Sequence, residues 1–177
     1  MIRSNVKTNA LRQTILTAMF LAIIVVQELA LSFLPNIQLT FVLFMVFATV
    51  LSPAHLVMLV VGYVLLDNLL FGSFNYFVVV PMFLAWGIYV AVSYGIRYRS
   101  IHWKILFSAL FGLVYGWFYL PFTYLAFYQG VPNAFLMLLS VDLPFGMVLL
   151  VNNLFTMLAL YHPLTALIKS LVGQSIL

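Results

Sequence analysis

The chain carries only three acidic side chains, and each lies in or beside a long apolar run: Glu28, Asp67 and Asp142. Before Asp67 stands "LVMLVVGYVLL" (56–66), in which Tyr63 is the one strong hydrogen-bonding side chain. A carboxylate that faces lipid at the bilayer centre costs about 2.5–3.5 kcal/mol on insertion scales. We therefore expect Glu28 and Asp67 to face a polar cavity. Asp142 has two equal readings, a cavity or a headgroup-level position at the start of a helix, favoured by the helix dipole.

Amide, hydroxyl and aromatic side chains accompany these acids. "PNIQLT" (35–40) and "GSFNY" (72–76) are expected as two loops on one side of the membrane. "YGWFYLPFTYLAFYQG" (115–130) holds eight aromatic residues in sixteen, with Pro121 expected to kink the helix. Rings beside a few polar groups suit a flat, partly apolar solute, whereas an interfacial aromatic belt explains Tyr124 to Tyr128. The predicted solute-binding side chains are Asn36, Gln38, Asp67, Asn68, Asn75, Tyr115, Tyr119, Phe122 and Asp142.

Residue patterns that would indicate an enzyme are missing from the sequence. There is no cysteine, no G-x-x-x-x-G-K-[ST], no H-E-x-x-H and no G-x-S-x-G. The three histidines are scattered rather than grouped with carboxylates. We therefore expect no catalytic residue, no metal site and no cofactor. Asn152 and Asn153, in the last apolar run, need partners inside the helix bundle and have helix-to-helix bonding as their plainer explanation.

The elements that must position these groups are apolar helices. The 177 residues are 66% hydrophobic and 6% charged, whereas a soluble domain carries about 25% charged residues. The sequence thus predicts an all-α integral membrane protein in a single domain, 1–177. Runs of about 20 apolar residues indicate spanning helices, and the tail 163–177, which begins with a proline, is expected as a short interfacial segment. The six predicted transmembrane helices are 13–34, 37–52, 54–71, 77–96, 105–128 and 141–162.

The basic residues predict the orientation of these helices. With six spans and a cytoplasmic N-terminus, all seven fall in cytoplasmic segments, as the positive-inside rule requires: Arg3, Lys7, Arg12, Arg97, Arg99, Lys104 and Lys169. Both termini are therefore expected inside the cell (N-in, C-in), and the three acids in the outer half. The net charge of +4 is too small and dispersed to indicate nucleic-acid binding.

A stripe of small residues runs along the cytoplasmic half of the first helix. "AMFLA" (18–22) places Ala18 and Ala22 one turn apart, and Ala10 and Thr14 extend the stripe. Small residues four apart allow another helix to approach closely. Together with the length, the basic N-terminus, "LPNIQLT" (34–40) and "LLDNLLFGSFN" (65–75), this arrangement resembles the substrate-binding (S) components of energy-coupling factor transporters.

The resemblance implies a multi-pass vitamin-uptake subunit in a bacterial plasma membrane. Ala18 and Ala22 would dock on a transmembrane coupling subunit, which two cytoplasmic ATPases drive, so the missing nucleotide motif would be expected. The loops at 34–38 and 72–76 and the last three helices would enclose the solute. The solute predicted from the loop motifs is cobalamin, with pantothenate next. A membrane assembly subunit without a solute and an intramembrane enzyme are the rival classes.

Overall fold

The computed structural model describes residues 2–72 and 74–173, and all regular secondary structure within these ranges is helical. The helices have these bounds: α1 Ile2–Leu31, α2 Thr40–Phe47, α3 Pro53–Leu70, α4 Tyr76–Gly95, α5 Ile101–Val114, the 3₁₀ helix η1 Tyr115–Phe118, α6 Leu120–Phe127 and α7 Ala134–Val172. Five segments are long and apolar enough to cross a membrane. Large apolar side chains are exposed along them, among them Val26, Val57 and Phe155. This surface suits lipid rather than water and supports a helical membrane protein.

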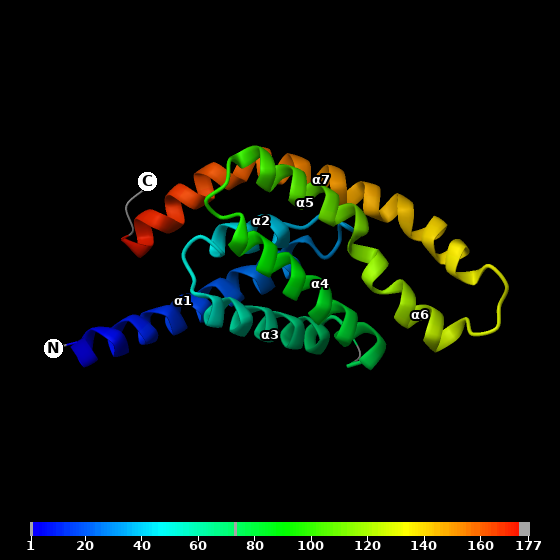
Figure 1. The fold of residues 1–177 in the computed structure, drawn as a ribbon, viewed down its shortest axis with the longest axis horizontal. Helices are drawn as coiled ribbons and strands as arrows, with labels where there is room; N and C mark the ends of the chain where they lie inside the picture. Colours follow the sequence, from blue (N-terminus) through cyan, green and yellow to red (C-terminus); the bar gives the residue numbers. More distant parts are fainter. Residues whose placement is uncertain (1, 73, 174–177) are drawn as a thin grey trace.

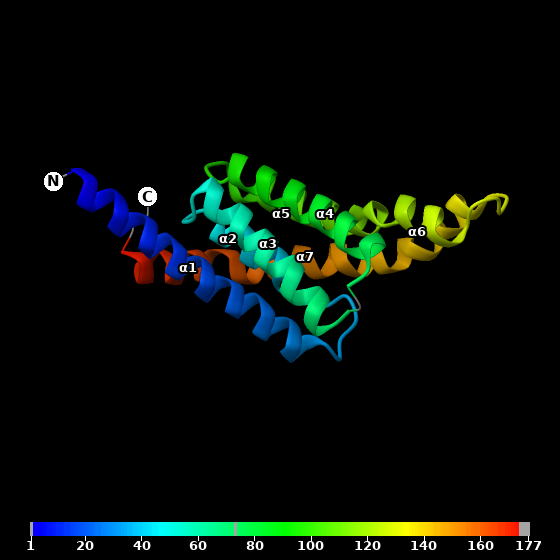
Figure 2. The same ribbon diagram turned by 90° about the horizontal axis from the view of Figure 1, so that it is seen from below.

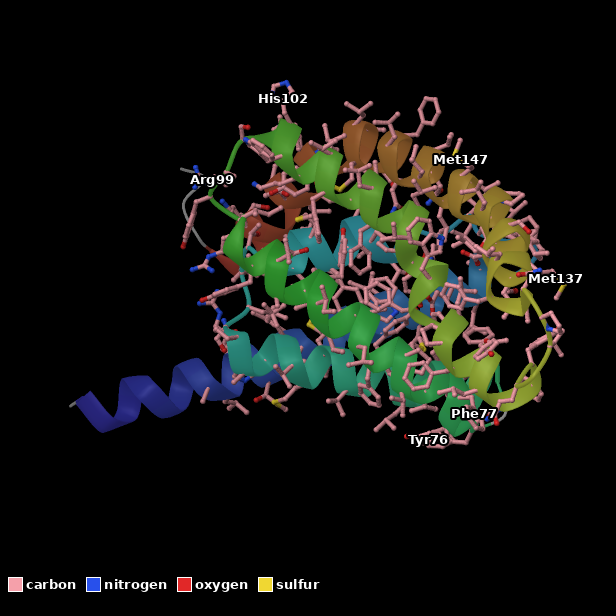
Figure 3. The ribbon with its side chains drawn as sticks, turned by 45° about the vertical axis from the view of Figure 1, so that its right-hand side comes forward. Tyr76, Phe77, Arg99, His102, Met137 and Met147 are labelled. Atoms are coloured by element: carbon pink, nitrogen blue, oxygen red, sulfur yellow. The ribbon has the colours of Figure 1, made fainter. Side chains whose placement is uncertain are left out.

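The helices form an elongated bundle with both chain ends at the same end of the molecule (Figures 1 and 2). The turn between α4 and α5 lies at that end too, where Figure 3 shows Arg99 and His102. Tyr76, Phe77 and Met137 lie toward the opposite end in the same view. Arg12 of α1 donates a hydrogen bond to the carbonyl oxygen of Val172, the last residue of α7. The first and last helices are thus joined at the basic end of the bundle.

The segment 37–52 differs from its prediction as a full spanning helix. It contains only the 8-residue α2, and every residue of α2 is buried. Eight residues rise about 12 Å, whereas the hydrocarbon core of a bilayer is about 30 Å thick. Apolar content predicted a lipid-facing helix, but here it reflects burial inside the bundle, against α1, α4, α5 and α7.

Two glutamines of α1 hold α2 at its two ends. At the N-terminal end, the Gln27 amide accepts from the backbone N–H of Leu39 (2.9 Å) and donates to Thr40 Oγ1 (2.7 Å). Beyond the C-terminal end, the Gln13 amide donates to the Val50 carbonyl (3.1 Å) and accepts from the Ser52 N–H (3.0 Å). These bonds satisfy backbone groups that a short helix leaves unpaired in an apolar interior.

Aromatic rings pack around α2 and form the centre of the core. The ring centroids of Phe41 and Phe44 lie 4.8 and 4.9 Å from that of Trp86 on α4. The Tyr89 hydroxyl donates to the Phe41 carbonyl (2.9 Å), so the polar end of that buried ring is satisfied. All four of these side chains are fully buried. This aromatic cluster packs around the N-terminal half of α2, and the ring of Trp86 also contacts the rings of Tyr63 and Tyr115.

The last two predicted spans also have different bounds. The segment 105–128 is broken into α5 and α6 by the 3₁₀ turn η1, just before Pro121 in the first turn of α6, which confirms the expected kink. The prediction of a helix at 141–162 with a separate tail is wrong: α7 is one helix of 39 residues with Pro163 inside it. A proline removes a single backbone bond, and bundled apolar helices tolerate this loss. Residues 174–177 lie outside the described residues.

Glycines bring α5 and η1 close to α7. A Cβ built on Gly112 would lie 3.0 Å from the Leu149 carbonyl oxygen and 2.6 Å from Asn153 Nδ2, and one on Gly146 would collide with the Leu113 carbonyl. "GLVYG" (112–116) is a G-x-x-x-G pattern, which permits such an approach between membrane helices. This close contact of α5 and η1 with α7, which the sequence analysis did not identify, positions Tyr115 and Tyr119.

Candidate functional site

A cavity of about 410 Å³ lies between the helix ends opposite the chain termini. Four elements and one loop supply its wall: the end of α1, the loop after it, α3, α4 and η1 with the residue that follows. This volume falls within the range of pockets that enclose drug-sized molecules. The lining residues are Glu28, Leu31, Ser32, Leu34, Pro35, Asn36, Ile37, Gln38, Tyr63, Asp67, Phe71, Val78, Met82, Tyr115 and Tyr119.

Glu28 is the most strongly bonded polar group of the cavity. Its Oε1 accepts from the Tyr63 hydroxyl at 2.6 Å and from Thr40 Oγ1 at 2.9 Å. Thr40 is the first residue of α2, so the carboxylate lies at that helix's N-terminus, where the dipole favours a negative charge. The other oxygen, Oε2, is buried and accepts from no donor in the described part of the chain. One oxygen of this carboxylate is bonded to α2 and α3, and the other accepts from no N–H or hydroxyl group in residues 2–72 and 74–173.

Asp67 faces the same cavity from α3. Its carboxyl group is within hydrogen-bonding reach of the Glu28 carboxyl group. Two carboxylates so close repel one another unless a proton or a cation lies between them. Within residues 2–72 and 74–173, no N–H or O–H of the loops is bonded to the Asp67 carboxylate. Asp67 therefore borders the cavity without a bond to the loops in these ranges.

A pair of tyrosines separates this cavity from a second one. The hydroxyls of Tyr115 and Tyr119 are hydrogen-bonded to one another at 2.9 Å, and both side chains line both cavities. The second cavity has a volume of about 340 Å³ and includes Asp142, whose Oδ2 is buried and has no donor among the described residues. Asp142 lies against Gly116, where any Cβ would collide with the carboxylate. The G-x-x-x-G glycine therefore makes room for this acid.

Most of the predicted binding residues meet at these two cavities. Asn36 lines both of them and adopts a left-handed backbone (φ 60°), which asparagine tolerates. Gln38 lines the first cavity, and its carbonyl accepts from Asn152 Nδ2 at 2.7 Å. Tyr115, Tyr119 and Asp67 lie as described above. Residues of α1, α3, α4, η1, α6 and α7 thus line the two cavities.

Asp142 borders the second cavity and does not lie at the start of a helix, as its alternative interpretation required. The helix α7 begins at Ala134, so Asp142 lies more than two turns inside it. The dipole's effect falls off within the first turn. The helix N-terminus therefore does not explain this carboxylate.

Three predicted binding residues lie elsewhere. Asn68 is 2% exposed, and its amide donates to the Val64 carbonyl (2.8 Å) and to Met82 Sδ (3.3 Å), so it holds α3 against α4. Asn75 caps α4 by accepting from the Phe77 N–H at 2.9 Å. Phe122, in α6, is not among the described residues that line either cavity. The direction in which a side chain leaves its helix decides whether it borders the cavity or bonds inside the bundle, and residue type alone does not predict that direction.

Sequence reasoning omitted Tyr63, Thr40 and Gln27 from the site. A signal for Tyr63 was available, because it stands four residues before Asp67 and therefore on the same helical face. Thr40 and Gln27 have no such signal, since their roles depend on where α2 begins. Asn152 donates to the Gln38 carbonyl in the loop before α2, and Asn153 Nδ2 donates to the Ser108 carbonyl of α5 at 2.8 Å, which confirms the expectation that they need partners in the bundle.

Comparison with family models, curated proteins and solved structures finds no match to this chain. The fold and cavities therefore define the class by themselves. The described residues form an all-helical protein with five apolar segments of membrane-spanning length, which supports transmembrane character. Between these helices lies a polar cavity bordered by two carboxyl groups.

Proposed function

We propose that this chain is the solute-binding subunit of a bacterial importer of the energy-coupling factor type. It would bind a vitamin in the outer half of the membrane and deliver it inward with a transmembrane coupling subunit and two cytoplasmic ATPases. In this proposal the chain is not an enzyme, because its partners hydrolyse ATP. The resemblance described in the sequence analysis and the position of the cavity support it together.

The single observation that carries the proposal is the cavity beside Asp67. Its wall combines carboxylates, tyrosine hydroxyls and the loop 32–38, as expected for a pocket with a few convergent polar groups. A structural subunit without a solute would have no need of carboxyl oxygens that accept from no donor among the described residues, such as Glu28 Oε2, because an unpaired polar group costs free energy in an apolar bundle. A metal-dependent enzyme would need a cluster of metal ligands, and the part of the chain described here has no group of three His, Cys, Asp or Glu that could hold an ion.

The small-residue stripe on α1 supports the docking part of the proposal. Ala10, Thr14, Ala18 and Ala22 are all exposed along the side of α1. None of these four lines the cavity. A coupling subunit could therefore contact the stripe without displacing a bound solute.

The cavity volume bears on which vitamin is bound. About 410 Å³ suits a drug-sized molecule, whereas a corrinoid with its nucleotide tail is much larger. The volume thus favours a small vitamin over cobalamin, the candidate that the loop motifs suggested. Cobalamin and pantothenate are both tested below.

The experiment is binding followed by uptake. Purified protein in detergent is titrated with radiolabelled cobalamin and pantothenate, and co-purified small molecules are identified by their absorption spectra and mass. Cells that express the chain with a coupling subunit and ATPases are then assayed for uptake, with a chain carrying Phe122→Ala as a control outside the cavities. A protein that binds no solute and supports no uptake would favour the assembly-subunit alternative.

The proposed N-in, C-in orientation requires six crossings, so the segment 37–52 with the buried α2 would have to return the chain across the membrane beside the five apolar spans. The position of both chain ends at one end of the bundle supports this orientation, which has its own test. The chain contains no cysteine, so single cysteines introduced at positions 5 and 174 report only on the two termini. Both should resist an impermeant maleimide in intact cells and react after lysis. Ready labelling of either position from outside would contradict the orientation.

A further inference from the structure

The two cavities have a strongly one-sided charge. Together they contain all three acidic side chains of the protein, Glu28, Asp67 and Asp142. None of the described residues that line them is basic. The basic side chains of the bundle lie at the opposite end, by the turn between α4 and α5 and in the last turn of α7. No protein cation therefore balances the acids.

The carboxyl oxygens are also incompletely bonded. Glu28 Oε2 and Asp142 Oδ2 are buried, and no donor in residues 2–72 or 74–173 reaches them. Asp67 adds a second carboxyl group within hydrogen-bonding reach of Glu28. A buried carboxylate without a partner is costly, so such groups are paired or neutralised in folded proteins. A proton shared by Glu28 and Asp67 would leave one negative charge on the pair. A cationic group in the cavity would pair with that charge and with Asp142.

The rest of the cavity wall suits a cation that carries an organic body. Three tyrosines line the cavity: Tyr63, Tyr115 and Tyr119. The ring of Trp86 packs against two of them, with centroid distances of 5.3 Å to Tyr63 and 5.5 Å to Tyr115. Aromatic faces attract ammonium groups through the ring quadrupole. The tyrosine rings are held in place by this packing and by the Tyr115–Tyr119 hydrogen bond. An ammonium group could thus lie among rings and carboxylates together.

A bare metal ion fits these features less well. A divalent ion such as Ca²⁺ takes six to eight oxygen ligands in a close shell. Glu28 and Asp67 supply two carboxyl groups. Glu28 Oε1 already accepts hydrogen bonds from Tyr63 and Thr40. No third His, Cys, Asp or Glu joins them in the described ranges. A cavity of about 410 Å³ is also far larger than one ion.

We propose that the solute is an organic cation, a protonated amine or quaternary ammonium compound of vitamin size, held between the Glu28–Asp67 carboxyl pair and the tyrosine rings. This inference rests on the proposed solute-binding function and names the ligand class of the same cavity. Anionic solutes are rejected, because their carboxylates would meet two others with no basic residue to intervene. Pantothenate is such an anion.

The test uses pairs of probes that differ in charge and little in shape. Choline is paired with 3,3-dimethylbutan-1-ol, and 2-phenylethylammonium with 2-phenylethanol. Each probe is titrated into the full-length protein in detergent and sodium phosphate, without Tris or other amines. Binding is followed by the rise in melting temperature, which grows with ligand concentration when the ligand binds the folded state, and by saturation-transfer NMR. Cobalamin and pantothenate are measured in parallel.

At least one cation should bind about tenfold or more tightly than its neutral partner, in keeping with a charge-assisted bond. Asp67→Asn should reduce that preference to less than about threefold, whereas Phe122→Ala should leave it intact. Equal binding of the paired probes, or a preference that survives Asp67→Asn, would overturn the inference. Binding of pantothenate or cobalamin without binding of any cation would overturn it too, while leaving the proposed solute-binding function standing. If no solute binds, both proposals fail.

Discussion

Replacement of Asp67 provides the sharpest test of the site. The carboxylate borders the cavity, and no loop donor within the described ranges is bonded to it. If the proposed function holds, Asp67 contacts the solute directly, and Asp67→Asn should weaken binding nearly as much as Asp67→Ala. A lost charge-assisted hydrogen bond costs about 1.5–3 kcal/mol. At about 1.4 kcal/mol per factor of ten, the dissociation constant should rise roughly ten- to a hundredfold.

The Asp67→Asn substitution should have a different effect on stability when no solute is bound. An asparagine at position 67 can donate its amide hydrogen to the Glu28 carboxyl group, which lies within hydrogen-bonding reach. It also removes one of two repelling charges. The melting temperature of the empty Asp67→Asn protein should therefore equal or exceed that of the native protein, while its affinity falls.

The assay is a titration of the purified variants with the solute that binds the native protein, beside a melting curve of each empty variant. Phe122→Ala serves as the control, because Phe122 is not among the described residues that line the cavities. Native affinity in Asp67→Asn together with a lowered melting temperature would refute direct contact. Asp67 would then be a structural residue.

Three further predictions test other parts of the molecule. Leucine at Ala18 or Ala22 should stop uptake but leave solute binding intact, since both alanines are exposed away from the cavity; normal uptake would exclude this face as the docking surface. Gly146→Ala should lower the melting temperature because its Cβ would meet a backbone carbonyl, whereas Gly87→Ala has nothing within 4 Å and should not; equal melting would contradict the close approach. Gln27→Leu removes two hydrogen bonds to the start of α2 and should cost about 1–3 kcal/mol of unfolding free energy, measured by denaturation; an unchanged value would mean that the aromatic core alone holds α2.

Some predictions from residue type alone agree with the structure. The near absence of charge indicated apolar helices, and Glu28 and Asp67 were expected beside a cavity because an acid in an apolar bundle needs polar surroundings. Pro121 indicated the break in the segment 105–128. These inferences succeed because the physical cost applies wherever the residue lies in the bundle.

Other features depend on neighbours that are distant along the chain. The segment 37–52 is as apolar as a spanning helix, and only the bundle around α2 makes it a short buried one. Pro163 could end a helix or be accommodated within one, and the packing of α7 decides that it is accommodated. Asn68 and Asp67 are adjacent in sequence, yet one points into helix packing and the other borders the cavity.

The sequence by itself determined that this protein is helical, apolar on its surface and acidic at one end, because these properties follow from composition and charge placement. Only the tertiary structure decided which polar groups meet. Glu28, Thr40 and Tyr63 come together because Gln27 holds the start of α2 beside α1 and α3. That contact involves four residues on three helices, and no spacing along a single helix encodes it. The site therefore depends on the position of a short buried helix that hydropathy could not distinguish from a membrane span.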